Sequence, residues 1–478
     1  MFTHVGAVVG EFAGADLGDK RRAGRLEQIA ELLDKQPAAG FPRAMGSDAA
    51  LEGFYRFINN DGFSAEDIVE PHIAATIQRA ARSKTVLAVH DTTAVEFSTM
   101  REGLRITSSS RHQGFLTHAA LLVAAERGLP LGLGYLETRV RTGEKRSRQR
   151  RKAGQLRYAT RNDETRESLR WLRGIDAVEK SRRREGFEVI HVTDAEGDFF
   201  ELLDLLRTSE ARFVIRAGHL VRAVLDDGDE SSVREVADKV LPQAWREIDI
   251  SVRNLPARTV GANSRRRHPE RSARRTRVAI GSGRVTLKKT KYSGLNATPL
   301  EVNIVRVWEP DPVTGHPPVE WILLTTEDVS TPASVERIVD IYRQRWIIEE
   351  YFKALKTGCS LEKRQVESYD ALRKVLALFA PIAYRLLLLR GIERIDPTTP
   401  ASQVFSPIEL RIMVRAPSNR GLPPPDTVAA GLLHLAKLGG HIRNNGRPGW
   451  QTLAWGYEKL LTLRLGWELA EAQKCDQS

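Results

Sequence analysis

The sequence predicts an α/β core that is interrupted by a β-rich insertion and flanked by helical segments at both ends. Between residues 85 and 216, compact apolar strand patterns alternate with helical ones, which is typical of α/β proteins. Residues 219–325 form mainly strand-like segments and are rich in Arg, Gly and Pro. Helical patterns dominate the first 70 residues and the residues after 326. A chain of 478 residues has room for several domains.

The N-terminal half contains four predicted helices and five predicted strands. Helical periodicity predicts helices over 19–35 and 49–58. The predicted strands cover residues 85–90, 187–192 and 212–216. A β-hairpin is predicted for 114–125 and 132–140. A long charged helix is predicted over 161–183, and a further helix over 198–208.

The C-terminal half begins with the strand-rich region and ends in helices. Its predicted strands lie at 246–252, 276–280, 284–287, 301–307 and 320–325. Long helices are predicted over 332–357 and 372–390, and a Pro-rich loop at 421–425 precedes further helices. These patterns predict five parts, at 1–70, 71–218, 219–325, 326–392 and 393–478.

The composition is that of a globular protein with a basic charge balance. Hydrophobic residues make up 41% and charged residues 28%, which excludes a fibrous or disordered class. Lys and Arg number 73 against 61 Asp and Glu, a net charge of +12, so the expected partner is a polyanion, either nucleic acid or an acidic membrane surface. Basic runs at 141–151, 181–184 and 264–277 favour phosphate contacts spread along one long ligand.

The same composition limits where the protein acts. No apolar run approaches the roughly 18 residues of a membrane span, so no membrane segment is expected. The N-terminus lacks the basic start of a signal peptide. Two cysteines, Cys359 and Cys475, exclude a disulfide scaffold and a cysteine-based zinc site, and they suit a reducing cytoplasm.

Two aspartates follow predicted strands. Asp91 and Asp194 each lie at or just past the end of an apolar strand, at the sheet edge where open α/β sheets bind ligands. An Asp after a strand is also a common turn former. The two positions alone therefore do not establish a site.

A third acid lies on the predicted helix over 332–357. On a regular helix, Tyr342, Arg345, Glu349, Lys353 and Lys356 lie within about 80° of arc. A solvent-exposed face with i,i+4 ion pairs would share part of this pattern. A metal-binding carboxylate with cations for phosphates beside it explains the tyrosine, the basic charge and the two strand-end aspartates together.

These residues carry a resemblance to a known family. Tyr342, Arg345, Glu349 and Lys356 match the YREK signature of the IS4-family DDE transposases in identity and spacing. Asp91 in HDTT, Asp194 in TDAEGD and Glu349 take the places of the D, D and E. The segments LGDKRRAGRL, EGFYRFINN, WILLTTE and LAKLGG also resemble family segments. The residues after Asp91 and the Arg-rich stretch 141–160 depart from the family.

The resemblance implies an RNase H-like catalytic core that cuts and joins DNA with two divalent ions. Mg²⁺ is expected, with Mn²⁺ as a substitute, and Asp91 would bridge both ions while Asp194 and Glu349 each complete one. The implied partners are double-stranded DNA, as transposon ends and target, and a second copy of the chain. Cleavage would pass through a DNA hairpin, and neither a nucleotide cofactor nor a membrane is expected.

The resemblance also implies DNA contacts. Arg21, Arg22 and Arg25 would read the transposon end, while residues 393–478 would form the dimer. Trp321 would stack on a flipped base, although a buried core aromatic is the alternative for Trp321 and for Trp346. The remaining expected DNA contacts are Arg216 and Lys353.

Three acids near the expected ligands receive other roles. Glu196 and Asp198 are expected to orient neighbouring groups or to cap a helix, and Glu350 is not expected to be a ligand. Two alternative functions stay open from sequence, a catalytically silent DNA-binding regulator and an RNase H-like nuclease.

Overall fold

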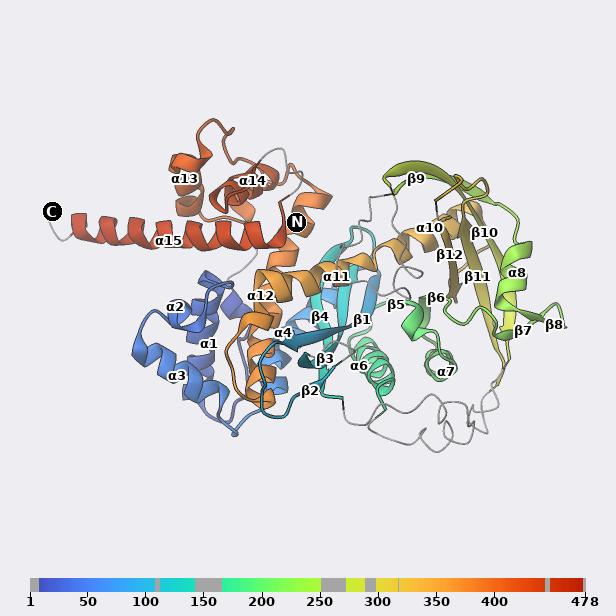
Figure 1. The fold of residues 1–478 in the computed structure, drawn as a ribbon, viewed down its shortest axis with the longest axis horizontal. Helices are drawn as coiled ribbons and strands as arrows, with labels where there is room; N and C mark the ends of the chain where they lie inside the picture. The colour runs from blue at the N-terminus through green and yellow to red at the C-terminus, as the bar shows by residue number, and fades with distance from the viewer. Residues whose placement is uncertain are drawn as a thin grey trace. The chain divides into compact units, whose positions relative to one another are not determined.

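The computed structural model describes residues 8–107, 112–141, 166–250, 272–288, 298–316, 318–442 and 448–475 (Figure 1). The chain forms two compact units. Unit 1 comprises Met1–Arg146, Lys180–Glu188 and Trp346–Ser478. Unit 2 comprises Ser147–Glu179 and Val189–Arg345. The described part is a mixed α/β protein with twelve strands and many helices.

Unit 1 contains an antiparallel sheet. Its order is β2 (Arg105–Ile106), β3 (Gln113–Ala124) and β1 (Val86–Phe97), with β4 (Leu129–Arg139) on the other side of β3. The pairing of β3 with β4 confirms the predicted hairpin.

Strand β1 is longer than the sequence predicts. Pairing with β3 continues from Val86 to Phe97, so Asp91 lies in the middle of β1, opposite Ala119, and not at its end. The residues Thr92, Thr93 and Val95 are β-branched and favour an extended chain, which explains the continuation. Burial changes at Asp91, since the five residues before it are buried, whereas Asp91 and the next three residues are half-buried.

The helix α12 (Tyr369–Ile395) forms the centre of unit 1. It packs against α4 (Ala65–Ala81) and β4, and most of its residues are buried. By length and composition α12 could cross a membrane, contrary to the expectation that no segment is long enough. However, 78% of its most apolar window is buried inside the protein, which is the environment of a core helix.

The N-terminal helices of unit 1 begin at capping side chains. Helix α1 (Lys20–Lys35) is capped by Asp19, and α3 (Asp48–Ile58) by Ser47, as expected from N-cap preferences. A short 3₁₀ turn, η1 (Val8–Glu11), precedes them, and α2 (Phe41–Met45) lies between them. Both predicted helices, 19–35 and 49–58, are confirmed to within one residue.

The C-terminal helices of unit 1 share a separate apolar cluster. Helices α13 (Pro407–Arg415), α14 (Val428–Leu438) and α15 (Trp450–Cys475) pack on one another (Figure 1). A short 3₁₀ turn at Ala401–Gln403 precedes α13, and another at Pro417–Asn419 lies between α13 and α14. The cluster also includes Ile392 at the end of α12.

Unit 2 contains a mixed sheet. Strand β5 (Val189–Thr193) is parallel to β6 (Arg212–Arg216), and the order continues through β12 (Glu320–Thr325), β11 (Leu300–Trp308), β10 (Arg274–Leu287), β7 (Ala223–Asp226) and β8 (Asp229–Ser232), all antiparallel. Strand β9 (Ala244–Ile250) pairs with β10. Apolar residues of β6, β10, β11 and β12 form one core cluster.

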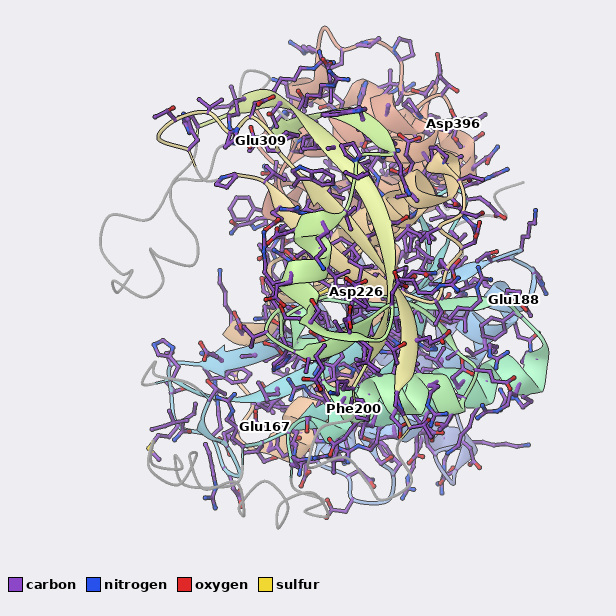
Figure 2. The ribbon with its side chains drawn as sticks, turned by 90° about the vertical axis from the view of Figure 1, so that its right-hand side faces the viewer. Glu167, Glu188, Phe200, Asp226, Glu309 and Asp396 are labelled. Carbon is purple, nitrogen blue, oxygen red and sulfur yellow. The ribbon has the colours of Figure 1, made fainter. Side chains whose placement is uncertain are left out.

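The helices of unit 2 border this sheet. They are α7 (Phe200–Thr208), α8 (Val233–Lys239) and α10 (Pro332–Arg343), and the N-terminal part of α6 (Leu169–Glu185) belongs to the same unit. Phe200 begins α7 and Asp226 ends β7 (Figure 2). The predicted helix 161–183 lies in part outside the described residues. The helix that the structure describes there, α6, begins at Leu169.

Two predicted strands, 276–280 and 284–287, are a single strand. Strand β10 runs through Gly281 and Gly283, which the sequence alone suggests as a break. Glycine at position 281 lets the backbone of Leu241 lie close to β10, because a Cβ at 281 would lie 2.1 Å from the carbonyl oxygen of Leu241.

The predicted helix 332–357 is interrupted. Helix α10 ends at Arg343, α11 (Trp346–Lys353) follows, and a π-helical turn, η3 (Ala354–Gly358), succeeds it. The amides of Gln344 and Arg345 bond to carbonyls three residues back, which tightens the last turn of α10. No Gly or Pro lies between 333 and 357, so residue type could not reveal the break. The single helical face predicted for 342–356 is therefore wrong.

Candidate active site

Unit 1 positions two of the three predicted acids. Asp91 is half-buried in β1, and its Oδ1 accepts a hydrogen bond of 2.7 Å from the amide of Thr92. Helix α11 packs against β1 and carries Glu349, which is also half-buried. The structure therefore places these two carboxylates on packed elements of one unit.

The π-helical turn fixes Lys356 to the same strand. Its Nζ donates to the carbonyl oxygen of Ala94 in β1 and forms an ion pair of 3.3 Å with Glu362. Glu362 also accepts a hydrogen bond of 3.2 Å from the amide of Glu96. Lys356 thus holds the turn onto β1 three residues from Asp91. Single π-turns occur frequently at functional sites.

A histidine pair lies beside Asp91, and the sequence analysis did not identify it. His90 and His118 are buried on β1 and β3, with ring centroids 5.9 Å apart. His118 Nδ1 lies 2.9 Å from the hydroxyl of Thr92. The signal in the sequence was the pair of histidines within strand patterns, but only the strand register brings them together.

Unit 2 positions the third acid. Asp194 directly follows β5, as predicted, and its side chain accepts a hydrogen bond of 2.9 Å from the amide of Glu196. Tyr342, at the end of α10, is close enough to Asp194, Arg216 and Arg345 for all three to act on its pKa. Burial raises the pKa of Tyr342 and the Asp194 charge adds to this, while the two arginines oppose them. The net effect is a raised pKa, so the phenol keeps its proton at neutral pH.

Trp321 lies against Tyr342. The two rings make an edge contact, with centroids 5.9 Å apart and planes at 61°. Trp321 is half-buried at the start of β12, and Arg216, at the end of β6, is exposed. The tryptophan is therefore not enclosed in the core, and part of its side chain stays exposed.

Asp198 and Glu196 have structural partners. Asp198 is 1% exposed and accepts hydrogen bonds from the amides of Gly218 and His219, at 2.7 and 2.8 Å, beside an ion pair with Arg222. Helix α7 is instead preceded by Phe199, without a side-chain cap, so Asp198 does not cap it. Glu196 caps no helix in the described part and pairs with Arg170 at 3.3 Å.

The three N-terminal arginines have different environments. Arg21 is exposed and pairs with Asp19 at 3.2 Å, and Arg25 is exposed on the next turn. Arg22 donates to the carbonyl oxygens of Leu17 and Gly62, at 2.9 and 3.3 Å. Arg22 therefore holds the fold of this segment, whereas Arg21 and Arg25 face solvent.

The other predicted DNA contacts are scattered. Trp346 is 58% exposed at the start of α11, and Lys353 pairs with Glu350 at 2.8 Å. The basic runs 141–151 and 264–277 lie mostly outside the described residues. In the described end of the second run, Arg274 pairs with Glu309, which follows β11 (Figure 2).

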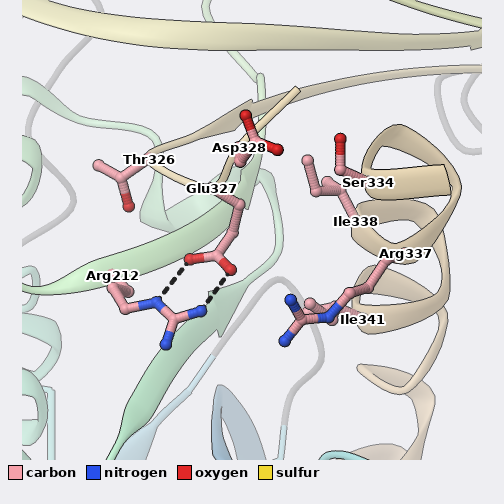
Figure 3. A pocket seen from close by; sticks show the side chains of 8 residues that line it. All are labelled: Arg212, Thr326, Glu327, Asp328, Ser334, Arg337, Ile338 and Ile341. Carbon is pink, nitrogen blue, oxygen red and sulfur yellow. Dashed lines mark hydrogen bonds and ion pairs between the residues drawn. The ribbon is translucent and has the colours of Figure 1, made fainter. Parts of the chain in front are cut away.

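A pocket of about 330 Å³ lies elsewhere in unit 2. An Arg212–Glu327 pair lines it, with bonds of 2.8 and 2.6 Å, and Arg337 reaches toward it from α10 (Figure 3). The pocket involves the start of β6 and the end of β12, whereas Arg216 and Trp321 lie at the opposite ends of these strands. None of the predicted site residues lines it.

The donor set is chemically suited to a hard divalent ion. Asp91, Asp194 and Glu349 offer carboxylate oxygens, the ligands that Mg²⁺ prefers. Asp91 and Glu349 belong to unit 1 and Asp194 to unit 2. Within the described ranges, no three His, Cys, Asp or Glu side chains form a metal-binding group.

Comparison with known families identifies the kind of protein. A family model described as transposase DNA-binding matches residues 6–63. A second, described as transposase DDE domain, matches residues 135–383, which is 249 of the 478 residues. The chain belongs to the DDE transposases. DDE domains generally use divalent metals to cleave and transfer DNA. The DNA-binding match and the DDE match together make DNA the partner of this transposase.

The matched ranges cover most of the predicted site. Asp194 and Glu349 lie inside the DDE match of the transposase, and Asp91 lies before it. Arg21, Arg22 and Arg25 lie inside the DNA-binding match.

Proposed function

We propose that this protein is a cut-and-paste transposase of the IS4 type, similar to the Tn5 transposase. The observation that carries the proposal is the DDE match, which contains Asp194 and Glu349 together with the YREK spacing of Tyr342, Arg345 and Lys356. Asp91 is the proposed first acid, because β1 carries it and packs against the helix of Glu349. The proposed core is RNase H-like, with residues 219–325 as its β-rich insertion.

The proposed chemistry has four steps on DNA. Water cleaves one strand at the transposon end and leaves a 3′-OH. That 3′-OH attacks the opposite strand to form a hairpin, water reopens the hairpin, and the freed 3′-OH attacks the target. Two divalent ions held by Asp91, Asp194 and Glu349, Mg²⁺ or Mn²⁺, would supply charge neutralisation and activate the attacking oxygen when bound.

Cationic and phenolic side chains have separate tasks in this proposal. Arg216 and Arg345 neutralise phosphate charge, and the protonated hydroxyl of Tyr342 donates a hydrogen bond to a phosphate oxygen. Lys356 holds the π-helical turn against β1, which supports the direction of Asp91 and Glu349. Trp321, with its half-exposed ring, stacks on the base that leaves the helix at the hairpin.

The remaining parts recognise ends and pair the subunits. The proposed end-binding segment is 1–70, in which Arg21 and Arg25 face solvent and can meet phosphates. The proposed core comprises 71–218 and 326–392, and 393–478 is the proposed pairing region for a second copy. This division rests on the family resemblance.

A strand-transfer assay tests the proposal. Purified protein is mixed with Mg²⁺, a labelled duplex taken from the flank of its own gene, and supercoiled target. Joined products support a transposase, cleavage without joining indicates a nuclease, and binding without cleavage indicates a regulator. The Glu349→Gln variant is the control for contaminating nucleases, because it keeps the size of the side chain and removes its charge.

A further inference from the structure

Helix α11 needs lateral support to hold Glu349 in one direction. It has eight residues, with a break at Gln344 and Arg345 before it and the π-helical turn after it. A helix this short is marginal by itself, and its orientation depends on tertiary contacts. The buried side chains of Ile347, Ile348, Tyr351 and Phe352 supply apolar contacts.

The polar support comes from Glu350, the residue after Glu349. Its Oε2 accepts a hydrogen bond of 2.8 Å from the indole Nε1 of Trp450, the first residue of α15. Its Oε1 accepts one of 2.8 Å from Lys353, and Arg390 of α12 lies 3.5 Å from Oε2. One carboxylate thus joins α11, α12 and α15.

Trp450 is itself held firmly. It is 7% exposed, and the guanidinium of Arg390 lies 4.8 Å from the centroid of its ring. A hydrogen bond between a buried indole and a carboxylate is directional and charge-assisted. Helix α15 also packs against η3, the turn that carries Lys356. Helix α15 therefore contacts the segments that carry Glu349 and Lys356.

Consecutive residues of a helix project about 100° apart. Fixing Glu350 against Trp450 therefore fixes the direction of Glu349 relative to β1. We propose that Glu350 and Trp450 are positioning residues, through which the C-terminal helix α15 holds the carboxylate of Glu349 in its metal-binding direction. The inference rests on the proposed role of Glu349.

The critical variant is Trp450→Phe, which removes the indole N–H and keeps an aromatic ring on Arg390. We expect it to slow DNA cleavage about tenfold at saturating DNA, the effect of about 1.4 kcal/mol. We expect it to weaken Mn²⁺ binding severalfold, measured by electron paramagnetic resonance of the free ion. The dissociation constant for DNA and the melting temperature should stay near wild type.

Four further variants complete the design. Trp455→Phe is the matched control, since Trp455 is 46% exposed on the same helix and should tolerate the change. Glu350→Gln keeps an oxygen acceptor for the indole and should retain more activity than Glu350→Ala. The double variant Glu350→Ala with Trp450→Phe should be no slower than Glu350→Ala alone, because both act through one contact.

Two sets of results would overturn the inference. One is wild-type cleavage and Mn²⁺ binding by Trp450→Phe. The other is an equal loss of DNA binding, melting temperature and cleavage, which indicates a general packing role. Glu349→Ala separates the two levels: if it binds Mn²⁺ like wild type, the proposed metal role of Glu349 fails first. If it loses Mn²⁺ while Trp450→Phe does not, only the positioning role fails.

Discussion

Acidification should destabilise the folded state through one buried histidine that contacts the start of the DNA-binding segment. His72 on α4 is 0% exposed, and its Nδ1 donates to Glu11 over 2.5 Å. Its Nε2 accepts a hydrogen bond of 3.1 Å from the amide of Leu133 in β4. Because an amide can only donate, Nε2 carries no proton and the ring is neutral.

The pKa values of the pair agree with this geometry. Burial lowers the pKa of His72, although the Glu11 charge opposes the shift. Burial raises the pKa of Glu11, but His72 and Arg79 outweigh burial and hold it at about 2. Glu11 therefore stays ionised over the range in which an unfolded histidine titrates.

The sign and size of the effect follow from linkage. A histidine whose pKa is lowered by folding contributes stability above its unfolded pKa of 6.5 and loses it as the pH falls. At pH 5.5, one unit below 6.5, the unfolded state gains about 1.4 kcal/mol if the folded ring stays neutral. Glu11 adds a further loss only below about pH 4.5, where the unfolded carboxyl takes up a proton.

The measurement compares wild type with His72→Gln between pH 7.5 and 5.5. Residue 72 of the variant cannot titrate. The fall in its melting temperature between pH 7.5 and 5.5 should therefore be a few degrees smaller than that of wild type. Hydrogen-exchange protection of the peptide that contains Leu133, corrected for slower intrinsic exchange in acid, should fall more for wild type than for the variant. Opening of this contact lets the ring of His72 take up a proton, which favours the open state. His112→Gln is the control, since the side chain of His112 is exposed.

Identical pH profiles for wild type and His72→Gln would refute the reasoning, since His72 would then titrate equally in both states. A functional consequence follows if the reasoning holds. Glu11 lies within the transposase DNA-binding match, so DNA binding should weaken at pH 5.5 more in wild type than in His72→Gln.

Three further predictions concern the DNA site. Alanine at Asp91, Asp194 or Glu349 should abolish DNA cleavage in Mg²⁺, while DNA binding in a gel-shift assay survives. Near-normal nicking by one of these variants would show that its residue is misassigned. DNA affinity should fall steeply with salt. Arg25→Gln should lower the slope of log K against log salt by about 1. Arg22→Gln should instead lower the melting temperature, because the hydrogen bonds of Arg22 to two carbonyl oxygens are lost. The reverse pattern would contradict the assignment of these two arginines. Trp321→Ala should spare the first nick and slow hairpin formation by about one to two orders of magnitude, because a stacked base is worth roughly 1–3 kcal/mol. Equal loss of both steps with a lower melting temperature would mean that Trp321 serves only packing.

Local chemistry allowed the sequence to determine most elements and the family. Strand β5 with Asp194 after it, the hairpin of β3 and β4, and helices α1 and α3 were predicted because apolar period, turn residues and N-caps are local signals. The YREK spacing indicated a DDE transposase because it is carried by residue identity along one segment.

Other features depend on contacts that no local pattern records. Asp91 lies in the middle of β1 because pairing with β3 continues beyond it. The helix break at Gln344 contains neither Gly nor Pro, so no residue type in the sequence indicates it. Arg22 resembles Arg21 and Arg25 in sequence, yet its guanidinium donates a hydrogen bond to the carbonyl oxygen of Gly62, 40 residues away.

The division between sequence and tertiary structure is clearest on helix α11. Glu349 and Glu350 are identical side chains in adjacent positions, and the family motif distinguishes them by spacing alone. The tertiary structure gives Glu350 an indole donor from a helix 100 residues further along the chain. Residue type determines which chemistry a side chain can perform, whereas long-range packing decides which partners each of two equal carboxylates meets.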